Sequence, residues 1–255
     1  MLARGRYQRR LRLSTKAAGV SGAAAANLQA MTADPVNLPA TTPAPPWAEA
    51  NEARVLDAAV LLAPRIGWGR GLAARAAEAA GLSAADAALL LPGGARDLAA
   101  LLSRRHDARA LEALAGTDPD SLKVRERIRR AVMARVEAAA VDEAAVRRCT
   151  AWLALPLNLP LGLGLLWESA AGLWRWAGDT ATDENHYSKR AILAGVLAAT
   201  VAARFQGGEA AAAQRLDIEI ERVMRFEKWK AGLPKPSEAM AGAVAALGRL
   251  RYGGR

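Results

Sequence analysis

The sequence predicts an all-α protein. Alanine is abundant among its 255 residues, 52% of the residues are hydrophobic, and only 5% are aromatic. Alanine, leucine, arginine and glutamate all favour helices. Nowhere do β-branched or aromatic residues alternate with polar ones over the length of a strand, so no sheet is expected. The chain is long enough for one large domain, or two small ones, with a buried core.

Residues 1–50 are expected to form a disordered extension that is first basic and then rich in proline. Residues 1–33 carry basic side chains but no acidic one, and the prolines follow from Pro35 to Pro46. An arginine-bearing, acid-poor start is typical of an organelle transit peptide. The alternative is an over-extended gene start with Met31 as the true initiator, which a composition typical of GC-rich bacterial genomes favours.

Residues 51–95 are predicted to form a subdomain similar to a helix-turn-helix. One amphipathic helix starts near Asn51 and ends at Gly67-Trp68-Gly69, and two short helices follow, over residues 72–80 and 84–91. This layout resembles the N-terminal domain of TetR-type proteins, whose second short helix normally enters the DNA major groove. Recognition of bases needs hydrogen-bonding side chains there, but the only polar residue of that helix is Asp86. We therefore expect a degenerate motif that binds no nucleic acid.

Residues 96–233 are predicted to form a helical bundle. A helix is expected over residues 96–115, and another where apolar residues recur every four positions from Val124 to Val136. Further helices are expected over residues 189–205 and around Leu216, Ile220 and Val223, which share one face.

The stretch from Cys149 to Trp167 contains no charged residue, and its length is that of a membrane span. Pro156 and Pro160 disfavour a lone spanning helix, because each removes a backbone donor. A kinked, deeply buried core helix is the prediction. Cys149 is the only cysteine, which excludes an internal disulfide and indicates a reducing compartment. We expect it to be a small buried hydrophobe rather than a reactive thiol.

The net charge of +10 lies at the two ends of the chain, which suits anionic phosphates on lipids or on nucleic acid. Residues 234–255 form a basic tail that is predicted to be either frayed or an amphipathic helix at a membrane surface. The residues expected to contact the membrane are Met240, Val244, Leu247, Leu250, Arg249 and Arg251.

No pattern of residues predicts catalysis. The sequence has no phosphate-binding glycine loop and no dinucleotide fingerprint. His106 and His186 are far apart in sequence and neither belongs to a helical metal motif. We expect no catalytic residue, no metal and no cofactor, and therefore a protein that is not an enzyme.

One segment is more specific than the rest. Residues 174–190 read WRWAGDTATDENHYSKR. They closely resemble the signature of the coenzyme Q biosynthesis protein nine family, which reads Gly-Asp-x-Ser/Thr-Thr-Asp-Phe-Asn-aromatic-Tyr-Ser/Thr-Lys/Arg-Arg. The earlier LPLNLP run at residues 155–160 and the IERVM run at residues 220–224 are also similar to that family.

The resemblance implies a TetR-like helical fold, usually homodimeric, with a hydrophobic pocket that binds isoprenoid lipids. It implies an accessory protein that presents a quinone precursor to a ring hydroxylase, typically a di-iron enzyme. The expected location is the inner face of the bacterial cytoplasmic membrane, with the matrix face of the mitochondrial inner membrane as the alternative. The alternative function is a TetR-type transcription regulator that responds to a ligand.

Two groups of site residues follow from the resemblance and from the uncharged stretch. The residues expected to bind lipid are Trp152, Leu153, Leu157, Leu161, Leu165, Trp167 and Trp174. The residues expected to bind the hydroxylase are Asp179, Asp183, Asn185, His186, Tyr187 and Arg190. The chain departs from the family at three places. His186 replaces the usual Trp, Glu184 replaces the usual Phe, and residues 206–209 lack the usual acidic loop. These differences bear on which hydroxylase is the partner.

Overall fold

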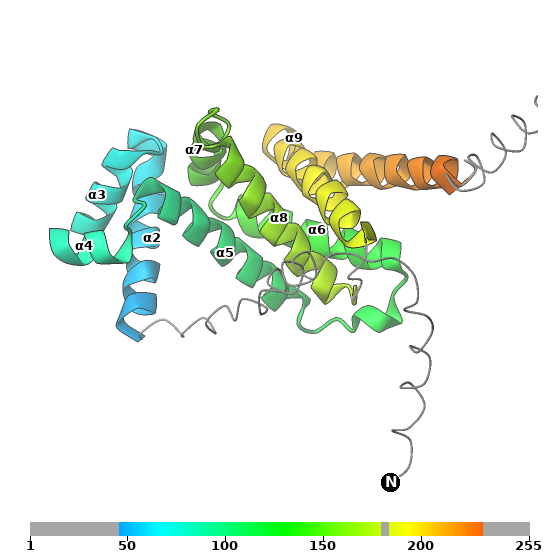
Figure 1. The fold of residues 1–255 in the computed structure, drawn as a ribbon, viewed down its shortest axis with the longest axis horizontal. Helices are drawn as coiled ribbons and strands as arrows, with labels where there is room; N and C mark the ends of the chain where they lie inside the picture. Colours follow the sequence, from blue (N-terminus) through cyan, green and yellow to red (C-terminus); the bar gives the residue numbers. More distant parts are fainter. Residues whose placement is uncertain (1–45, 180–183, 232–255) are drawn as a thin grey trace, which may run out of the picture. The chain divides into compact units, whose positions relative to one another are not determined.

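The structure is a computed structural model that describes residues 46–179 and 184–231. Within these ranges it contains eight α-helices and no strand, so the all-α prediction is confirmed for this part of the chain (Figure 1). The helices are α2 (Pro46–Ile66), α3 (Arg70–Ala79), α4 (Ala84–Leu90), α5 (Ala95–Leu114), α6 (Val124–Ala140), α7 (Glu143–Leu153), α8 (Leu159–Trp176) and α9 (Glu184–Ala231). A short 3₁₀ turn, Pro119–Ser121, precedes α6.

Helices α2, α3 and α4 form the predicted unit that is similar to a helix-turn-helix. Gly81, with a φ of 74°, turns the chain after α3, and the Ser83 hydroxyl accepts a hydrogen bond from the Asp86 amide (3.1 Å) at the start of α4. Trp68 is buried after α2, and its indole nitrogen donates to the Ala95 carbonyl (3.1 Å). Helix α2 begins at Pro46, ahead of the expected Asn51, because proline suits the first turn of a helix.

Two hydrophobic clusters hold the helices together. The first joins α2 and α3 to α5, α7 and α8, with Val55, Leu72 and Leu98 at most 1% exposed. The second joins α6 to α8 and α9 around Val132 and Leu216. The spacing that predicted α6 is confirmed, since Ile128, Val132 and Val136 are buried there. This arrangement agrees with the TetR-like bundle that the sequence predicts.

The uncharged stretch from Cys149 to Trp167 does not form the single kinked helix expected from the sequence. Helix α7 ends at Leu153 and α8 begins at Leu159, with a turn between them. The two prolines explain the break, since each disfavours a helical conformation in the preceding residue and lacks an amide donor. Asn158 closes the turn by donating its side-chain amide to the Trp152 carbonyl (3.0 Å). The stretch is also less buried than expected, because Leu157 is 82% exposed.

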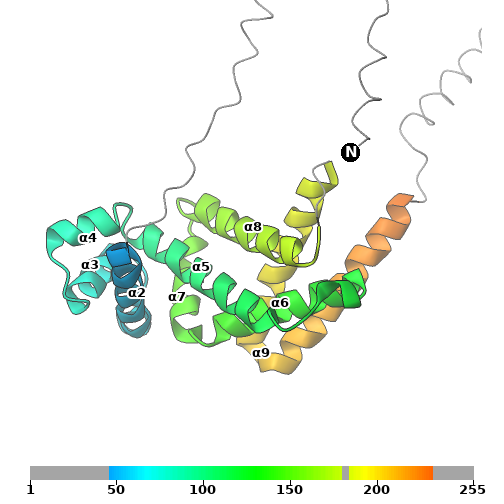
Figure 2. The same cartoon turned by 90° about the horizontal axis from the view of Figure 1, so that it is seen from below.

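Helix α9 is broken into two arms at Gly207 and Gly208. Gly208 has a φ of 75°, a left-handed conformation that favours glycine. Figures 1 and 2 show the two arms running in different directions. The segment Tyr187–Arg225 is long and apolar enough to cross a membrane, but a core helix passes the same test. Both arms are tied to α6, through Arg204 with Glu137 (2.9 Å) and Arg129 with Asp217 (2.9 Å).

Candidate functional site

An apolar pocket of about 360 Å³ lies among α5, α6, α7, α8 and the first arm of α9. Its volume is near the lower end of the range for pockets that hold small organic ligands, about 300–1,000 Å³. Its apolar walls are made by Ala99, Leu102, Ala139, Val146, Cys149, Leu153, Ala154, Leu159, Gly162, Leu163, Leu165, Leu166, Leu197, Ala198, Val201, Ala202 and Phe205. A wall of this composition favours a hydrocarbon ligand.

The local sequence explains how α7 and α8 form one side of this pocket. Gly162 lets α8 lie close to α7, because a side chain at this position would begin 3.3 Å from the Cβ of Leu153. Pro160 is accommodated in the first turn of α8, where its missing amide costs nothing. Leu153 from α7 and Leu165 from α8 therefore face the same space.

Exposed leucines lie at one side of the pocket and in the turn next to it. Leu159 and Leu163 line it and are 46% and 58% exposed. Leu155 and Leu157, in the preceding turn, are also exposed. The apolar wall thus continues onto the surface at the α7–α8 turn, where no charged side chain occurs.

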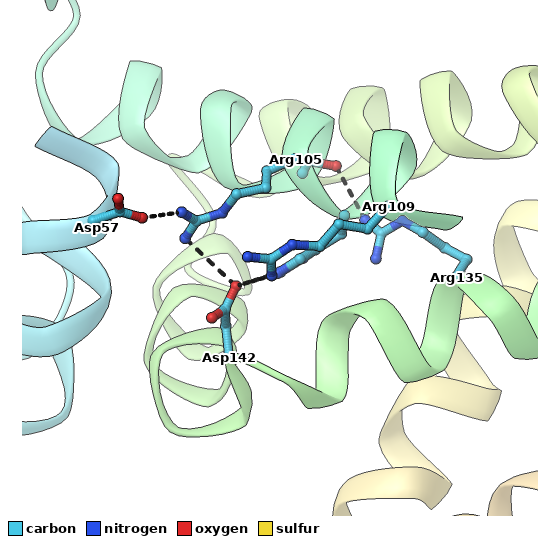
Figure 3. Close-up of polar contacts among 7 residues, drawn as sticks. Asp57, Arg105, Arg109, Arg135 and Asp142 are labelled. Atoms are coloured by element: carbon cyan, nitrogen blue, oxygen red, sulfur yellow. Dashed lines mark hydrogen bonds and ion pairs between the residues drawn. The ribbon is translucent and has the colours of Figure 1, made fainter. Parts of the chain in front are cut away.

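A network of charged side chains lies beside the pocket (Figure 3). Arg105 on α5 bridges Asp57 on α2 (2.5 Å) and Asp142 before α7 (3.4 Å). Asp142 also accepts from Arg109 (2.9 Å) and from His106 (2.9 Å). The network fastens α2 and the start of α7 to α5, and of these three helices α5 and α7 line the pocket.

Burial changes the proton affinity of two residues that line the pocket. Burial, helped by the nearby charge of Arg135, lowers the pKa of His106 from 6.5 to about 4, so the imidazole is neutral at pH 7. Burial raises the pKa of Cys149 to about 12, which suits the unreactive thiol predicted from the sequence. Burial also acts to raise the pKa of Asp142, but the hydrogen bond with His106 and the charge of Arg105 outweigh it and lower that pKa.

The structure brings two of the seven predicted lipid-binding residues, Leu153 and Leu165, to the pocket. Leu157 does not line the pocket and is exposed. The remaining four lie elsewhere: Trp152 and Leu161 pack against the first cluster, Trp174 packs against the second, and Trp167 stacks on Tyr187 with ring centroids 6.1 Å apart. Their contact with lipid stays a prediction that this pocket does not account for.

The predicted partner-binding residues fall into three groups: a nearly buried pair, an exposed tyrosine, and three residues whose side chains lie outside the described part of the chain. Arg190 is buried and the Asp179 side chain is 8% exposed; Asp179 lies 2.8 Å from the Lys189 ammonium and 3.7 Å from the Arg190 guanidinium. Such burial suits a structural role at the junction of α8 and α9. Tyr187 is 66% exposed, and its contact with a partner stays a prediction. Asp183 and the side chains of Asn185 and His186 lie outside the described residues, as do Met240, Val244, Leu247, Leu250, Arg249 and Arg251.

Several pocket residues were not predicted from the sequence. Leu197, Val201 and Phe205 come from α9, where their spacing of four residues places them on one face. That spacing was a signal available in the sequence. Ser103, His106, Arg135 and Ser169 add polar groups to the lining, and no local pattern marks them as neighbours. Among the described residues, no group of histidine, cysteine, aspartate or glutamate could hold a metal ion.

Comparison with known proteins identifies a relationship over part of the chain. A family model described as COQ9 matches residues 159–227, which include α8 and most of α9. Ubiquinone biosynthesis protein COQ9, mitochondrial, of Rattus norvegicus is 31% identical over 150 residues, which cover 56% of this chain and 48% of that protein. Its Homo sapiens counterpart is 30% identical over 149 residues, covering 56% and 47%. COQ9-B of Xenopus laevis is 29% identical over 158 residues, covering 58% and 52%.

The fold defines a TetR-like helical protein whose bundle contains an apolar pocket. Within that class, the family model and the curated relatives confirm the resemblance to the COQ9 family that the 174–190 motif predicts. The chain spans about half the length of the curated relatives that it matches.

Proposed function

We propose that this chain is a lipid-binding accessory protein of ubiquinone biosynthesis and not itself a catalyst. It holds the isoprenoid tail of a quinone precursor in the pocket and presents the molecule to a ring hydroxylase, a di-iron enzyme by resemblance, at a membrane surface. The single observation that carries the proposal is the pocket of about 360 Å³ with mostly apolar walls. The names of the COQ9 relatives support the pathway.

The physical argument starts from the insolubility of polyprenyl chains in water. Each methylene group moved out of water contributes about 0.8 kcal/mol to binding. The pocket is large enough for a ring or a few isoprene units and too small for a complete long tail. The exposed Leu159 and Leu163 offer an apolar exit, so the rest of the tail stays in contact with a membrane.

The membrane contact and the partner contact are parts of the same proposal. The uncharged α7–α8 turn with its exposed Leu155 and Leu157 suits the lipid–water interface. Tyr187, stacked on Trp167, offers an exposed aromatic surface to the hydroxylase. The relatives are mitochondrial by name, which fits the matrix-face location, while the bacterial inner membrane remains the other location proposed. A homodimer is also proposed, and light scattering after size-exclusion chromatography tests it.

Mass spectrometry of organic extracts from the natively purified protein tests the proposal. Isoprenoid quinones or their precursors are expected in the extract. Val201→Trp fills the pocket and should remove them, whereas Val141→Trp, at a site 70% exposed and away from the pocket, should not. A folded protein prepared without detergent whose extract contains no lipid would contradict the proposal.

The alternative function, a ligand-responsive transcription regulator, uses the same fold but requires α4 to contact DNA. Helix α4 offers no hydrogen-bonding side chain except the Asp86 carboxylate, which phosphates repel. A mobility-shift assay with random duplex DNA at low salt separates the two functions. Salt-sensitive binding would support the regulator.

A further inference from the structure

A second hollow, of about 350 Å³, lies on the surface between α2 and α7. Its walls are formed by Pro64 of α2 and by Ala144, Arg147, Arg148 and Ala151 of α7. In both views of the fold, α7 lies between α2 and α9 (Figures 1 and 2). Arg148 reaches towards α2, where it donates to the Pro64 carbonyl (3.3 Å). Arg147 reaches towards α9, where it donates to the Phe205 carbonyl. We call this hollow the α2–α7 groove.

The α2–α7 groove carries more positive than negative charge. Arg147 is paired with the carboxylate of Glu143 (2.6 Å). Arg148 is exposed and contacts no carboxylate within residues 46–179 and 184–231, and the same is true of Arg65 at the end of α2. The sequence supplies no acidic side chain nearby, since residues 144–167 and the last two turns of α2 contain none. Positive charge that is unmatched on one face attracts an anionic partner.

The groove is continuous with the exposed leucines of the α7–α8 turn. One face of α7 is followed by the residues four, seven and eleven positions after Ala144, which are Arg148, Ala151 and Leu155. Ala154 keeps a helical backbone beyond the end of α7, so Leu155 still follows this face. Since a helix rises about 1.5 Å per residue, Leu155 lies about 10 Å from Arg148 along the helix axis.

This distance matches the layers of a membrane surface. The headgroup layer is about 5–8 Å thick on each side of a bilayer. Apolar side chains at the interface enter about 5–10 Å beyond the boundary between headgroups and acyl chains. If the leucines of the turn enter the acyl layer, Arg148 is left at the level of the phosphate groups. A guanidinium group suits a phosphate because it donates two parallel hydrogen bonds to it.

The combination of a basic groove and an apolar turn favours a lipid surface over other anionic partners. Nucleic acid offers phosphates but no apolar layer for Leu155 and Leu157, which are 52% and 82% exposed. An anionic bilayer offers both, at the spacing that α7 provides. The charge of the groove and the apolar character of the turn are therefore complementary to the same partner.

We propose that the α2–α7 groove binds the phosphate group of an anionic phospholipid, while Leu155 and Leu157 enter the acyl layer beside it. Arg148 donates to the phosphate, and Arg65 adds positive charge from α2. The protein therefore meets the membrane with the α7–α8 turn and the outer face of α7. The inference rests on the proposed function, because it requires the chain to work at a membrane surface. It adds the class of lipid headgroup and the site that binds it.

Flotation of the full-length protein with two kinds of vesicle tests the groove. One kind is phosphatidylcholine alone, and the other is equal parts of phosphatidylcholine and phosphatidylglycerol. Arg148→Gln should weaken binding to the anionic vesicles about fivefold, as the loss of one arginine at an anionic surface provides, and should hardly change binding to the neutral ones. Arg148→Lys, which keeps the charge, should retain most of the binding. The matched control is Arg130→Gln, which removes an exposed charge from α6, outside the groove, and should weaken binding less than about twofold because salt screens distant charges.

Each other outcome has a definite meaning. Equal losses for Arg148→Gln and Arg130→Gln would overturn the groove and leave only general attraction by a basic chain. Release of the vesicles by excess glycerol 3-phosphate would assign the groove to a free phosphate compound, and binding to duplex DNA that Arg148→Gln weakens would assign it to nucleic acid. Either result would overturn the proposal. No binding of the unchanged protein to any vesicle would overturn the membrane part of the proposed function itself.

A fluorophore in the groove measures the orientation directly. Ala151→Cys places a thiol in the groove, and the single native cysteine, Cys149, is buried, so the new thiol is the one that a reagent labels. On anionic vesicles the emission of an environment-sensitive label at residue 151 should shift to shorter wavelength. The same label on Leu89→Cys, at a site 74% exposed on α4, should not shift. A label at residue 151 that stays in water while the protein is bound to vesicles would overturn the proposal.

Discussion

Lowering the pH below 6.5 is expected to destabilise the protein through His106. The pKa of this side chain is about 4 in the folded state, because burial disfavours the imidazolium, and 6.5 in an unfolded chain. Between these values the unfolded state binds more protons than the folded state, so the free energy of unfolding falls as the pH falls. The full stability is present above pH 6.5 and is lost progressively down to pH 4.

The size of this loss follows from the two pKa values. One pKa unit corresponds to about 1.4 kcal/mol, so His106 alone lowers the free energy of unfolding by about 2 kcal/mol at pH 5 and about 3 kcal/mol at pH 4. These values suit a side chain that is 2% exposed, since water screens it little. Asp142, whose pKa is lowered from 3.8, adds its own loss only at lower pH.

Urea unfolding of the protein and of His106→Gln, at pH 7.5 and pH 5, measures the contribution of His106. Glutamine retains an amide donor for Asp142 but does not titrate. The substitution itself should cost stability at both pH values. The loss of stability caused by the substitution should be about 2 kcal/mol smaller at pH 5. At that pH the wild-type chain is itself destabilised, because its His106 takes up a proton on unfolding, whereas glutamine cannot. A cost that is the same at both pH values would refute the neutral, buried imidazole.

Three further outcomes are expected. Leu157→Ser should weaken binding to phospholipid vesicles by up to about tenfold, whereas Leu89→Ser, exposed on α4, should not. Cys149 should react with a thiol reagent at pH 8 about 1,000-fold more slowly in the folded protein than after unfolding, because burial raises its pKa from 9.0 to about 12. Gly208→Ala should lower the free energy of unfolding by about 1–2 kcal/mol, because its φ is 75°, whereas Gly195→Ala, within a helix and facing open space, should raise it by about 0.5–1 kcal/mol. Melting curves check the sign of both.

Local patterns in the sequence predicted the helices well. The spacing of Ile128, Val132 and Val136 located α6, because a helix brings residues four apart onto one face. The glycines around Trp68 located the end of α2, since glycine readily adopts the positive φ needed there. Such signals act within a few residues and do not depend on the rest of the fold.

The candidate site could be predicted only in part. The uncharged stretch pointed to an apolar lining and supplied Leu153 and Leu165. Which of its leucines turn inward depends on the break after α7 and on the packing of α8, neither of which hydrophobicity alone determines. The contact of His106 with Asp142 joins residues 36 positions apart, and helical periodicity carries no information about such pairs.

The unit that is similar to a helix-turn-helix supports the wall of the pocket. Val55 and Leu72, from α2 and α3, are buried in the same cluster as Leu102, Cys149 and Leu165, and the last three also line the pocket. Removing the unit would expose the outer side of the pocket wall, because residues of α2 and α3 pack against residues that line the pocket. The stability of the pocket is therefore expected to depend on the packing of α2 and α3. It should not depend on α4, which contributes no buried residue.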